Sequence, residues 1–267
     1  MTAARVGRRD ARGAAAWWLS AVVFPVVALA AVLIIDDGWR LWSDLPRLAR
    51  SQTATDALLL ETVLMVIVAP LGGVALVMRR LRRCDRLMRK PSEEGTLRSA
   101  WSLAWPLCVG ATSFSVTSAV LAWTVLGMSS DPLPLIATSH AALWAATLAV
   151  AAGGALCASV LSHPLDAAAC AVGLALMVAA GVLVAGPVIG NAPTSVINAA
   201  LQASPIVAVA SAADVDILRM DVLYRLSPLA HVRFDYPHWQ ATCGWYVGLA
   251  ITVLVAMTRT FGRRTDA

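Results

Sequence analysis

The sequence predicts an all-α integral membrane protein with six transmembrane helices, formed by a single transmembrane domain over residues 1–267. Two observations carry this prediction. Apolar runs of about 20 residues recur six times, and a helix needs about 20 mostly apolar residues to cross roughly 30 Å of hydrocarbon. In addition, the chain is 59% hydrophobic and only 14% charged, whereas soluble domains carry about 25% charged residues. A soluble fold of this length would lack the polar surface to cover itself.

The six predicted helices are joined by connections of unequal length. The helices are 16–35, 57–78, 101–127, 135–161, 166–189 and 244–261. The first run follows a short basic tail, so a cleaved signal peptide is the alternative. That run is longer than the 7–15 apolar residues of a signal peptide, and no small-residue cleavage site follows it, so we interpret it as a retained helix. The connections 79–100 and 190–243 carry most of the candidate functional residues.

Basic residues are distributed unevenly between the two sides of the predicted bundle. Fifteen of the 21 Lys and Arg side chains fall on one side when the six runs are threaded through a bilayer. Basic residues near the ends of spans stay on the cytoplasmic side. The sequence therefore predicts a multi-pass membrane protein with both termini in the cytoplasm, the connection 79–100 inside and the connection 190–243 outside.

Topology also explains the net charge of +5. Nucleic-acid binding would need basic residues gathered on one folded face with aromatic or polar partners. In this chain the basic residues flank apolar spans instead. No nucleic-acid partner is therefore predicted, whereas contact of the basic connection 79–100 with anionic membrane lipid is expected, at about 1 kcal/mol per basic residue near the surface.

Residues 195–213 form a mildly apolar stretch inside the outer connection. Asn198, Gln202 and Pro205 interrupt it. If this stretch crossed the membrane, the C-terminus would move to the outer side. We expect instead a re-entrant or interfacial helical segment between the fifth and sixth helices, packed against the bundle, because irregular backbone at membrane depth is tolerated only where protein or water satisfies it. Its sequence leaves open which of the two it is.

Two ionisable residues, Glu61 and Asp166, lie within or at the ends of the apolar runs. A carboxylate in the middle of the bilayer costs about 2.5–3.5 kcal/mol on insertion scales. We interpret Asp166 as an N-terminal helix cap, which the helix dipole favours. We interpret Glu61 as facing the bundle or reaching toward the interface. A proton relay would need further intramembrane partners, and because the sequence offers only His140, no proton-coupled carrier is predicted.

Motifs for catalysis, metal binding and nucleotide hydrolysis are weak or missing in the sequence. His231, Asp235 and His238 have a spacing that metal ligands can adopt, but an intervening proline and the loop context argue against a site, so no metal or other cofactor is predicted. Ser113 lies in an apolar run without the G-x-S-x-G elbow of a nucleophile, and no enzyme activity is predicted. The single lysine, Lys90, is followed by proline, which excludes a Walker A motif.

An acidic turn, Glu93-Glu94-Gly95-Thr96-Leu97, interrupts the basic connection 79–100, and topology alone does not explain it. The turn resembles the stretch that follows the second helix in permeases of ABC-2 type transporters. The resemblance extends to the six helices, the cytoplasmic termini and the long outer segment between helices five and six. In that segment residues 203–209 are similar to the family's Asn-Pro-Phe-x-Ala-like stretch, and residues 223–229 and 234–237 resemble the outer loop of some bacterial members.

The chain also departs from the pattern of that family. Ser204 stands where asparagine is common, and the N-terminal tail is too short and too charged for the interfacial elbow helix of many members. These differences concern the subfamily and the docking geometry. They leave the order of helices and connections, on which most of the resemblance depends, unchanged.

The resemblance implies a membrane-spanning permease subunit of the bacterial plasma (inner) membrane, expected to be an exporter, that works with a separate ATP-binding subunit and a second permease subunit. It places the coupling contact with the ATPase at Arg82, Arg83, Arg86, Arg89, Glu93, Glu94, Gly95, Thr96 and Leu97. It places a candidate outer gate at Pro205, Tyr224 and Pro228. The transported substrate, the direction of transport and the choice between a homodimer and a heterodimer are left open.

Two other functions stay open at the level of sequence. A membrane-embedded enzyme acting on lipid or peptide would need a polar cluster at one depth, and the sequence shows only scattered single residues. An accessory membrane assembly protein without a transport path would use the outer connection 190–243 as its binding surface. Runs of small residues at 151–154 and 181–186 permit close helix approach but do not identify the face that is used.

Overall fold

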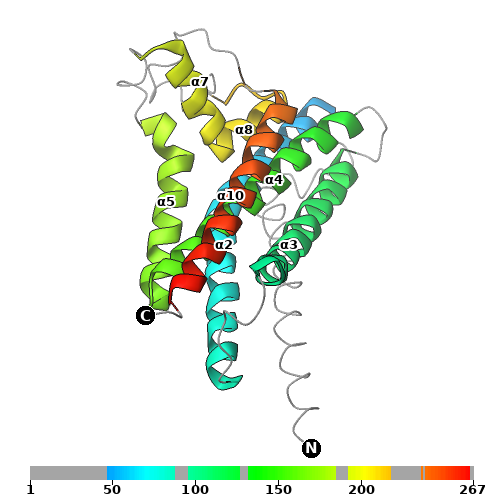
Figure 1. Cartoon of the computed structure of the whole chain (residues 1–267). Coiled ribbons are helices and arrows are strands. Elements are labelled where there is room, and N and C mark those ends of the chain that lie inside the picture. Colours follow the sequence, from blue (N-terminus) through cyan, green and yellow to red (C-terminus); the bar gives the residue numbers. More distant parts are fainter. Residues whose placement is uncertain are drawn as a thin grey trace, which may run out of the picture.

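The computed structural model describes residues 47–87, 96–126, 132–184, 192–217, 236 and 238–264. In this part of the chain the regular elements are all α-helices (Figure 1). They are α2 (Arg47–Leu87), α3 (Thr96–Val125), α4 (Leu133–Val160), α5 (Pro164–Val184), α7 (Thr194–Ala203), α8 (Pro205–Ala212) and α10 (Trp239–Arg264). The predicted first helix, 16–35, lies outside the described residues.

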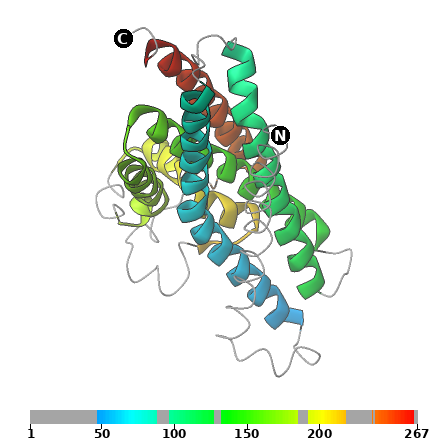
Figure 2. The same cartoon turned by 90° about the horizontal axis from the view of Figure 1, so that it is seen from below.

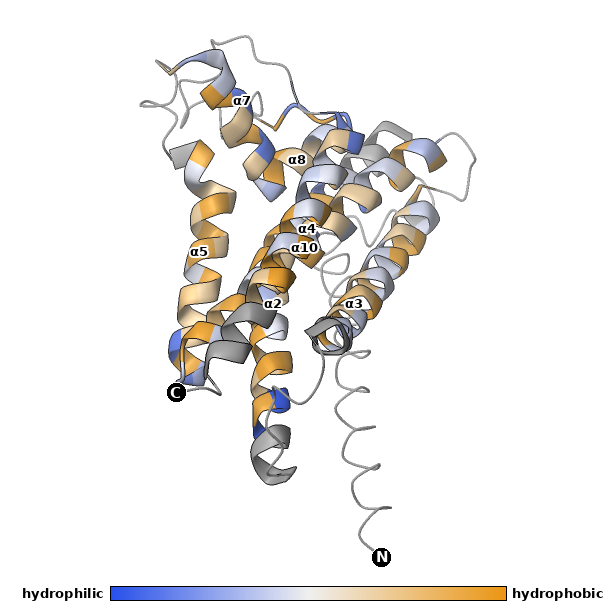
Figure 3. Ribbon diagram, in the orientation of Figure 1, coloured by the Kyte–Doolittle hydropathy of each residue, from blue (hydrophilic) through white to orange (hydrophobic). Residues whose placement is uncertain are grey.

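Five of these helices are long and apolar enough to cross a membrane. The spans are Thr55–Arg82, Trp101–Thr124, Leu133–Val160, Pro164–Val182 and Trp239–Met257. Apolar residues dominate the middle of these helices in Figure 3, whereas hydrophilic residues gather toward the ends of the bundle. The five spans correspond to the predicted second to sixth helices, and they are those expected of an all-α, multi-pass membrane protein.

Each of the five spanning helices begins before the apolar run that predicted it, and α2 and α10 show what the longer extensions contain. The helix α2 begins at Arg47, before the predicted start at residue 57, and continues to Leu87, so part of the predicted connection 79–100 is helical. The helix α10 begins at Trp239, inside the predicted outer connection. A helix satisfies its backbone hydrogen bonds internally, in water as well as in lipid, so hydropathy locates the buried part of a span and not the ends of its helix.

Two buried apolar clusters show the directions of the helices. The first cluster joins the end of α2, the start of α3, the ends of α4 and α10 and the start of α5 through Val77, Leu103, Ala158, Met257 and Ala167. We call this the hairpin end, because the chain passes from α2 to α3 there.

The second cluster joins the end of α5 to α7 and α8 through Val182, Ile197, Leu201 and Val207. We call this the α8 end.

The chain leaves α5 and enters α10 at the same end of the bundle. Val182, near the end of α5, packs in the cluster at the α8 end, and Tyr246, near the start of α10, donates a hydrogen bond to the carbonyl oxygen of Ala203 in α7. Figure 1 shows α7 and α8 lying across this end. The segment between α5 and α10 therefore departs from and returns to one end of the bundle.

The helix α4 is the centre of the bundle and contacts α2, α3, α5, α8 and α10. In the most apolar part of each span, 61% of α4 and 56% of α2 is buried inside the protein, whereas only 22% of α3 and 22% of α10 is buried. Viewed from below, α2 runs between α5 and α3 (Figure 2). Large side chains exposed on the outer helices, such as Val120, Met177 and Ile251, are apolar, as expected of a surface that contacts lipid.

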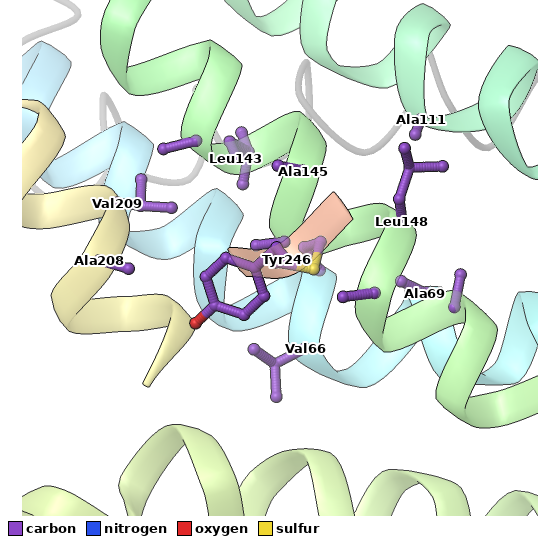
Figure 4. Close-up of a cluster of buried hydrophobic side chains, with 14 of the residues drawn as sticks. Val66, Ala69, Ala111, Leu143, Ala145, Leu148, Ala208, Val209 and Tyr246 are labelled. Carbon is purple, nitrogen blue, oxygen red and sulfur yellow. The ribbon is translucent and has the colours of Figure 1, made fainter. Parts of the chain in front are cut away.

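The largest buried cluster fills the middle of the bundle (Figure 4). It gathers side chains from six helices: Val66 of α2, Ala111 of α3, Leu143 of α4, Ala179 of α5, Val209 of α8 and Tyr246 of α10. Many members of this cluster are alanines, which let the helix backbones come close together. The Tyr246 ring lies among them and is 2% exposed.

The helices α2 and α4 approach each other at backbone distance through two glycines. A Cβ atom added to Gly73 would lie 1.9 Å from the carbonyl oxygen of Ala151, and one added to Gly154 would lie 2.1 Å from the carbonyl oxygen of Pro70. A real Cβ atom does not approach another atom so closely, so these two positions need glycine. Gly153, the adjacent residue of α4, has open space where its Cβ would be. The small-residue run 151–154 therefore packs against α2 through Gly154.

The substitutions Gly73→Ala and Gly154→Ala should each destabilise the protein, because the new methyl group forces two helix backbones apart. Inserting a methylene into a packed core costs about 1–3 kcal/mol, and a collision with backbone atoms belongs at the upper end of that range. The measurement is the thermal unfolding midpoint of the purified protein in detergent. Gly153→Ala is the matched control and should unfold as the wild type does. Equal midpoints for Gly154→Ala and Gly153→Ala would contradict the crossing.

Candidate functional site

Three polar side chains from three spans meet inside the bundle. They are Glu61 of α2, Ser118 of α3 and His140 of α4, with 4%, 1% and 6% of their surface exposed. The Ser118 hydroxyl donates a hydrogen bond to Oε2 of Glu61, and its oxygen lies 2.9 Å from Nε2 of His140. We call these three residues the polar cluster. Ser118 is its middle member, because both other side chains bond to the same hydroxyl.

The polar cluster lies at one depth in the bundle. With a rise of about 1.5 Å per residue, Glu61, Ser118 and His140 each lie about 9–10 Å inside the α8 end of their own span. All three groups are therefore within the apolar region and closer to the α8 end than to the hairpin end. Along the sequence the intramembrane polar residues are scattered, whereas the packing of α2, α3 and α4 brings these three together in space.

A buried stripe along α3 positions Ser118. The stripe consists of Leu103, Leu107, Ala111, Ser115 and Ser118, whose spacing of three or four residues puts them on one helix face. It is apolar toward the hairpin end and carries hydroxyls toward the α8 end. Ser115, one turn from Ser118 and 6% exposed, is among the buried polar side chains of the described residues that have no hydrogen-bond partner.

The imidazole of His140 is oriented by its own helix. Its Nδ1 atom lies 2.8 Å from the carbonyl oxygen of Ile136, and a carbonyl can only accept a hydrogen bond. Nδ1 therefore carries a proton, and Nε2 is directed toward Ser118. The hydroxyl of Ser139 also donates to the carbonyl of Ile136, at 3.1 Å. These contacts fix which ring nitrogen faces the polar cluster.

The order of the three groups differs from that of a serine nucleophile. In such a triad the histidine lies between the serine and the carboxylate, removes the proton of the serine, and is oriented by the acid through its other nitrogen. In the polar cluster Ser118 lies in the middle, and the other nitrogen of His140 bonds to a backbone carbonyl. Glu61 and His140 compete for one hydroxyl proton. The arrangement suits proton transfer between two bases rather than attack on a substrate.

Sequence reasoning named Glu61 and His140 but missed the serine that joins them. Ser118 was not distinguishable by residue type, because serine and threonine are frequent in α3. The periodicity of the stripe on α3 was the available signal. Ser113, the serine that the sequence singled out, instead donates to the carbonyl of Val109 in its own helix.

Asp166 lies apart from the polar cluster, near the hairpin end. It is the third residue of α5, so it sits within the first turn rather than at the cap position before it. Its Oδ1 atom lies 3.8 Å from Nδ1 of His163, and both side chains are more than half exposed. The interaction of the carboxylate with the helix dipole is still favourable at this position.

The predicted coupling residues that the structure describes lie at the hairpin end. Arg82 is exposed where the α2 span ends, Arg83 and Arg86 continue α2, and Thr96 and Leu97 begin α3. Arg89, Glu93, Glu94 and Gly95 lie outside the described residues.

The guanidinium of Arg80 donates to the hydroxyl of Ser102 and joins α2 to α3 at the hairpin end. Trp101 and Trp105, which stack at a centroid distance of 5.9 Å, are exposed as interfacial aromatic residues are.

At the opposite end, α7 and α8 form a bent pair with an angle of 88° between them. The bend is at Ser204, which is fully buried. Its hydroxyl donates to the carbonyl of Ala179 in α5, at 2.8 Å. Pro205, a predicted gate residue, is the first residue of α8 and is buried. The other two predicted gate residues, Tyr224 and Pro228, lie outside the described residues.

Side chains from two other spans add hydrogen bonds to the bent pair. Tyr246 of α10 donates to the carbonyl of Ala203, the last residue of α7, at 2.9 Å. The Thr138 hydroxyl of α4 lies 3.0 Å from the carbonyl oxygen of Ala212, the last residue of α8, and 3.0 Å from that of Leu135 in its own helix, so the two carbonyls share its single proton. The last carbonyls of a helix have no partner within it, and in lipid each unpaired group costs several kcal/mol. The bundle therefore supplies a partner for the last carbonyl of each short helix.

The described residues contain no group of three or more His, Cys, Asp or Glu side chains that could hold a metal ion. His231 and Asp235, from the weak metal-like spacing in the sequence, lie outside that part of the chain. His238 is exposed just before α10, and its Nδ1 atom lies 3.1 Å from Oε1 of Gln240.

Comparison with known proteins gives no match to this chain. No family model, no curated protein and no solved structure matches it. The functional argument therefore depends on the bundle itself, on the polar cluster and on the bent pair, together with the resemblance of the short motifs described above.

The substitutions Tyr246→Phe and Thr138→Val should loosen the bent pair, because each removes the donor to a helix-terminal carbonyl. A hydrogen bond contributes about 0.5–1.5 kcal/mol, so backbone amides in residues 203–213 should exchange several-fold faster. Hydrogen–deuterium exchange of the purified protein, read by mass spectrometry, measures this. Thr252→Val is the control, because Thr252 donates only to Gly248 of its own helix. Unchanged exchange in both test variants would show that these bonds do not hold the pair.

Proposed function

We propose that this chain is the membrane-spanning permease subunit of an ATP-driven transporter of the ABC-2 type. In this proposal it lies in the bacterial plasma membrane with both termini in the cytoplasm and the α8 end outside. It works with a separate ATP-binding subunit and with a second permease subunit, and it exports a substrate that is not identified. The observation that carries the proposal is the bent pair, which lies between α5 and α10, where the interrupted apolar stretch 195–213 predicts a re-entrant or interfacial element and the resemblance predicts a long outer segment.

The geometry of the bent pair supports a re-entrant segment over a further span. At about 1.5 Å per residue, α7 and α8 measure about 15 and 12 Å. Joined at 88°, they reach about 19 Å from end to end, well short of the roughly 30 Å of hydrocarbon. The chain also enters and leaves the pair at the α8 end. A re-entrant pair keeps the C-terminus on the side of the α2–α3 hairpin, as the distribution of basic residues requires.

The hairpin end supports a cytoplasmic docking surface. Helical backbone extends α2 to Leu87, beyond the end of its apolar span at Arg82. Arginines 82, 83 and 86 therefore lie on a helix that projects from the membrane, followed by the acidic turn. A rigid helix transmits a push from a partner subunit to α2 better than a flexible loop does, and α2 packs directly on the central helix α4.

The outer faces of α3, α5 and α10 support contact with membrane lipid and with a second permease subunit. These helices expose large apolar side chains such as Val116 of α3, Met177 of α5 and Ile251 of α10. Apolar surface of this kind is stable in a bilayer but not in water. No feature of these faces distinguishes an identical partner from a related one.

Of the alternatives, a membrane-embedded enzyme has the polar cluster in its favour, since it joins three polar groups at one depth. The order of those groups argues against a serine nucleophile, because Ser118 lies between the two bases. An accessory assembly protein would use residues of the outer segment, much of which lies outside the described residues. The permease proposal draws on both ends of the bundle, whereas the enzyme draws on the polar cluster alone and the accessory protein on the outer segment alone.

If the proposal holds, the full-length protein should co-purify with an ATP-binding subunit encoded beside it when both are expressed together. Arg82→Glu, or Glu93→Lys combined with Glu94→Lys, should reduce the recovered ATPase at least about tenfold, because like charges brought together across an interface cost several kcal/mol. Asp214→Lys is the control, since Asp214 is exposed at the α8 end. Failure of any ATPase to co-purify with the wild type would refute the proposal.

A further inference from the structure

The polar cluster contains one hydroxyl proton for two neighbouring bases. Ser118 has a single O–H group, while Oε2 of Glu61 and Nε2 of His140 both lie beside its oxygen. Since Nδ1 of His140 holds its proton against the carbonyl of Ile136, Nε2 of the neutral ring is an acceptor. With Glu61 ionised and His140 neutral, Ser118 can donate to only one of them. The other buried acceptor then has no partner within the cluster.

One added proton completes the hydrogen bonding in either of two ways. If the proton is on Glu61, the carboxyl donates to Ser118, and Ser118 donates to Nε2 of His140. If the proton is on Nε2, the imidazolium donates to Ser118, and Ser118 donates to Glu61. Both states carry no net charge over the three groups. They differ only in the position of the proton and in the direction of the Ser118 hydroxyl.

The surroundings of the polar cluster favour these two states over the form that lacks the proton. A net negative charge about 9–10 Å inside an apolar region is costly, and a buried acceptor without a donor adds to this cost. The described segments of the elements packed around the cluster hold no cation close to it. The basic side chains described on α2 are Arg79, Arg80 and Arg82, which lie near the hairpin end.

Other ionisable groups on the packed elements are distant or otherwise engaged. On α10 the Tyr246 hydroxyl donates to Ala203. Asp166 of α5 lies near the hairpin end with His163, and α8 carries no ionisable side chain. Asp56 lies near the start of the α2 span. The cysteines on the packed helices α3, α4, α5 and α10 are Cys108, Cys157, Cys170 and Cys243. Of these groups, none makes a hydrogen bond with the polar cluster in the described structure.

We propose that Glu61, Ser118 and His140 form an intramembrane proton-binding site that retains one proton and passes it between the carboxylate and the imidazole through the Ser118 hydroxyl. Transfer in one direction breaks the O–H bond of the Glu61 carboxyl, moves its proton to Ser118, and moves the Ser118 proton to Nε2. The reverse transfer restores the first state. The ligand of the site is the proton itself, and the inference does not depend on an ATPase partner.

The site joins three spans, so its proton also affects packing. With the proton bound, α2, α3 and α4 are linked by two hydrogen bonds through Ser118. Loss of the proton leaves one of these links without a donor. The hydroxyl of Ser115, which has no partner, is the next polar group of the same buried stripe of α3 in the direction of the hairpin end.

The test measures both bases in the full-length protein, purified in lipid nanodiscs, with pH as the only variable. Infrared spectroscopy detects a protonated carboxyl group, which is assigned to Glu61 by its loss in Glu61→Gln. Nitrogen NMR of histidine-labelled protein detects the protonation of Nε2, which is assigned by its loss in His140→Gln. We expect one of these two signals, or a mixture of both, to report the retained proton at neutral pH.

Variants of the bridging hydroxyl separate a relay from two independent groups. Ser118→Ala should shift the signals of both Glu61 and His140, and Ser118→Thr, which keeps a hydroxyl, should restore them. Ser113→Ala is the matched control on the same helix, because its hydroxyl bonds only to Val109, and it should leave both signals unchanged. An ionised Glu61 beside a neutral His140 at neutral pH, or signals that do not respond to Ser118→Ala, would overturn the proposal.

Discussion

The close approach of α2 and α4 is the constraint on which the rest of the bundle depends. Two glycines permit it, since a Cβ atom at Gly73 or Gly154 would overlap backbone atoms of the opposite helix. The helix α4 is the hub that contacts all the other spans of the described structure, so its position against α2 determines where α3, α5 and α10 pack. The same crossing brings Glu61 of α2 to the depth of His140 of α4, where Ser118 of α3 joins them.

The hydrogen bonding of polar groups inside the bundle is determined by the lipid that surrounds the protein. In lipid no water competes for hydrogen bonds, so each irregular part of the backbone and each buried polar side chain needs a partner from the protein. The bent pair obtains its partners from Ser204, Tyr246 and Thr138, which link it to three spans. The three groups of the polar cluster supply hydrogen-bond partners to one another, provided that the cluster holds one proton. The hydrogen bonds of the bent pair and of the polar cluster therefore both depend on how the surrounding spans pack.

Hydropathy and charge were sufficient to predict the five described spans, because each apolar run ends at a charged or proline-containing connection. They were not sufficient for helix ends: residues 47–56 are polar yet helical, since a helix needs no apolar residues outside the membrane. Gly153 and Gly154 are indistinguishable in the sequence, and only the crossing with α2 separates them. Glu61 and His140 were recognisable as candidates, but their meeting depends on the rotation of three helices, which no local pattern specifies.

The central claim is that the hairpin end faces the cytoplasm and the α8 end, with the nearby polar cluster, faces outward. Thiol labelling of intact cells by a membrane-impermeant maleimide tests this most directly. One variant keeps Cys84 as its only cysteine, and a second replaces all five native cysteines and adds Ser195→Cys at the exposed start of α7. The account predicts that position 195 is labelled in intact cells and Cys84 only after permeabilisation. Labelling of Cys84 from outside, with protection of position 195, would contradict it.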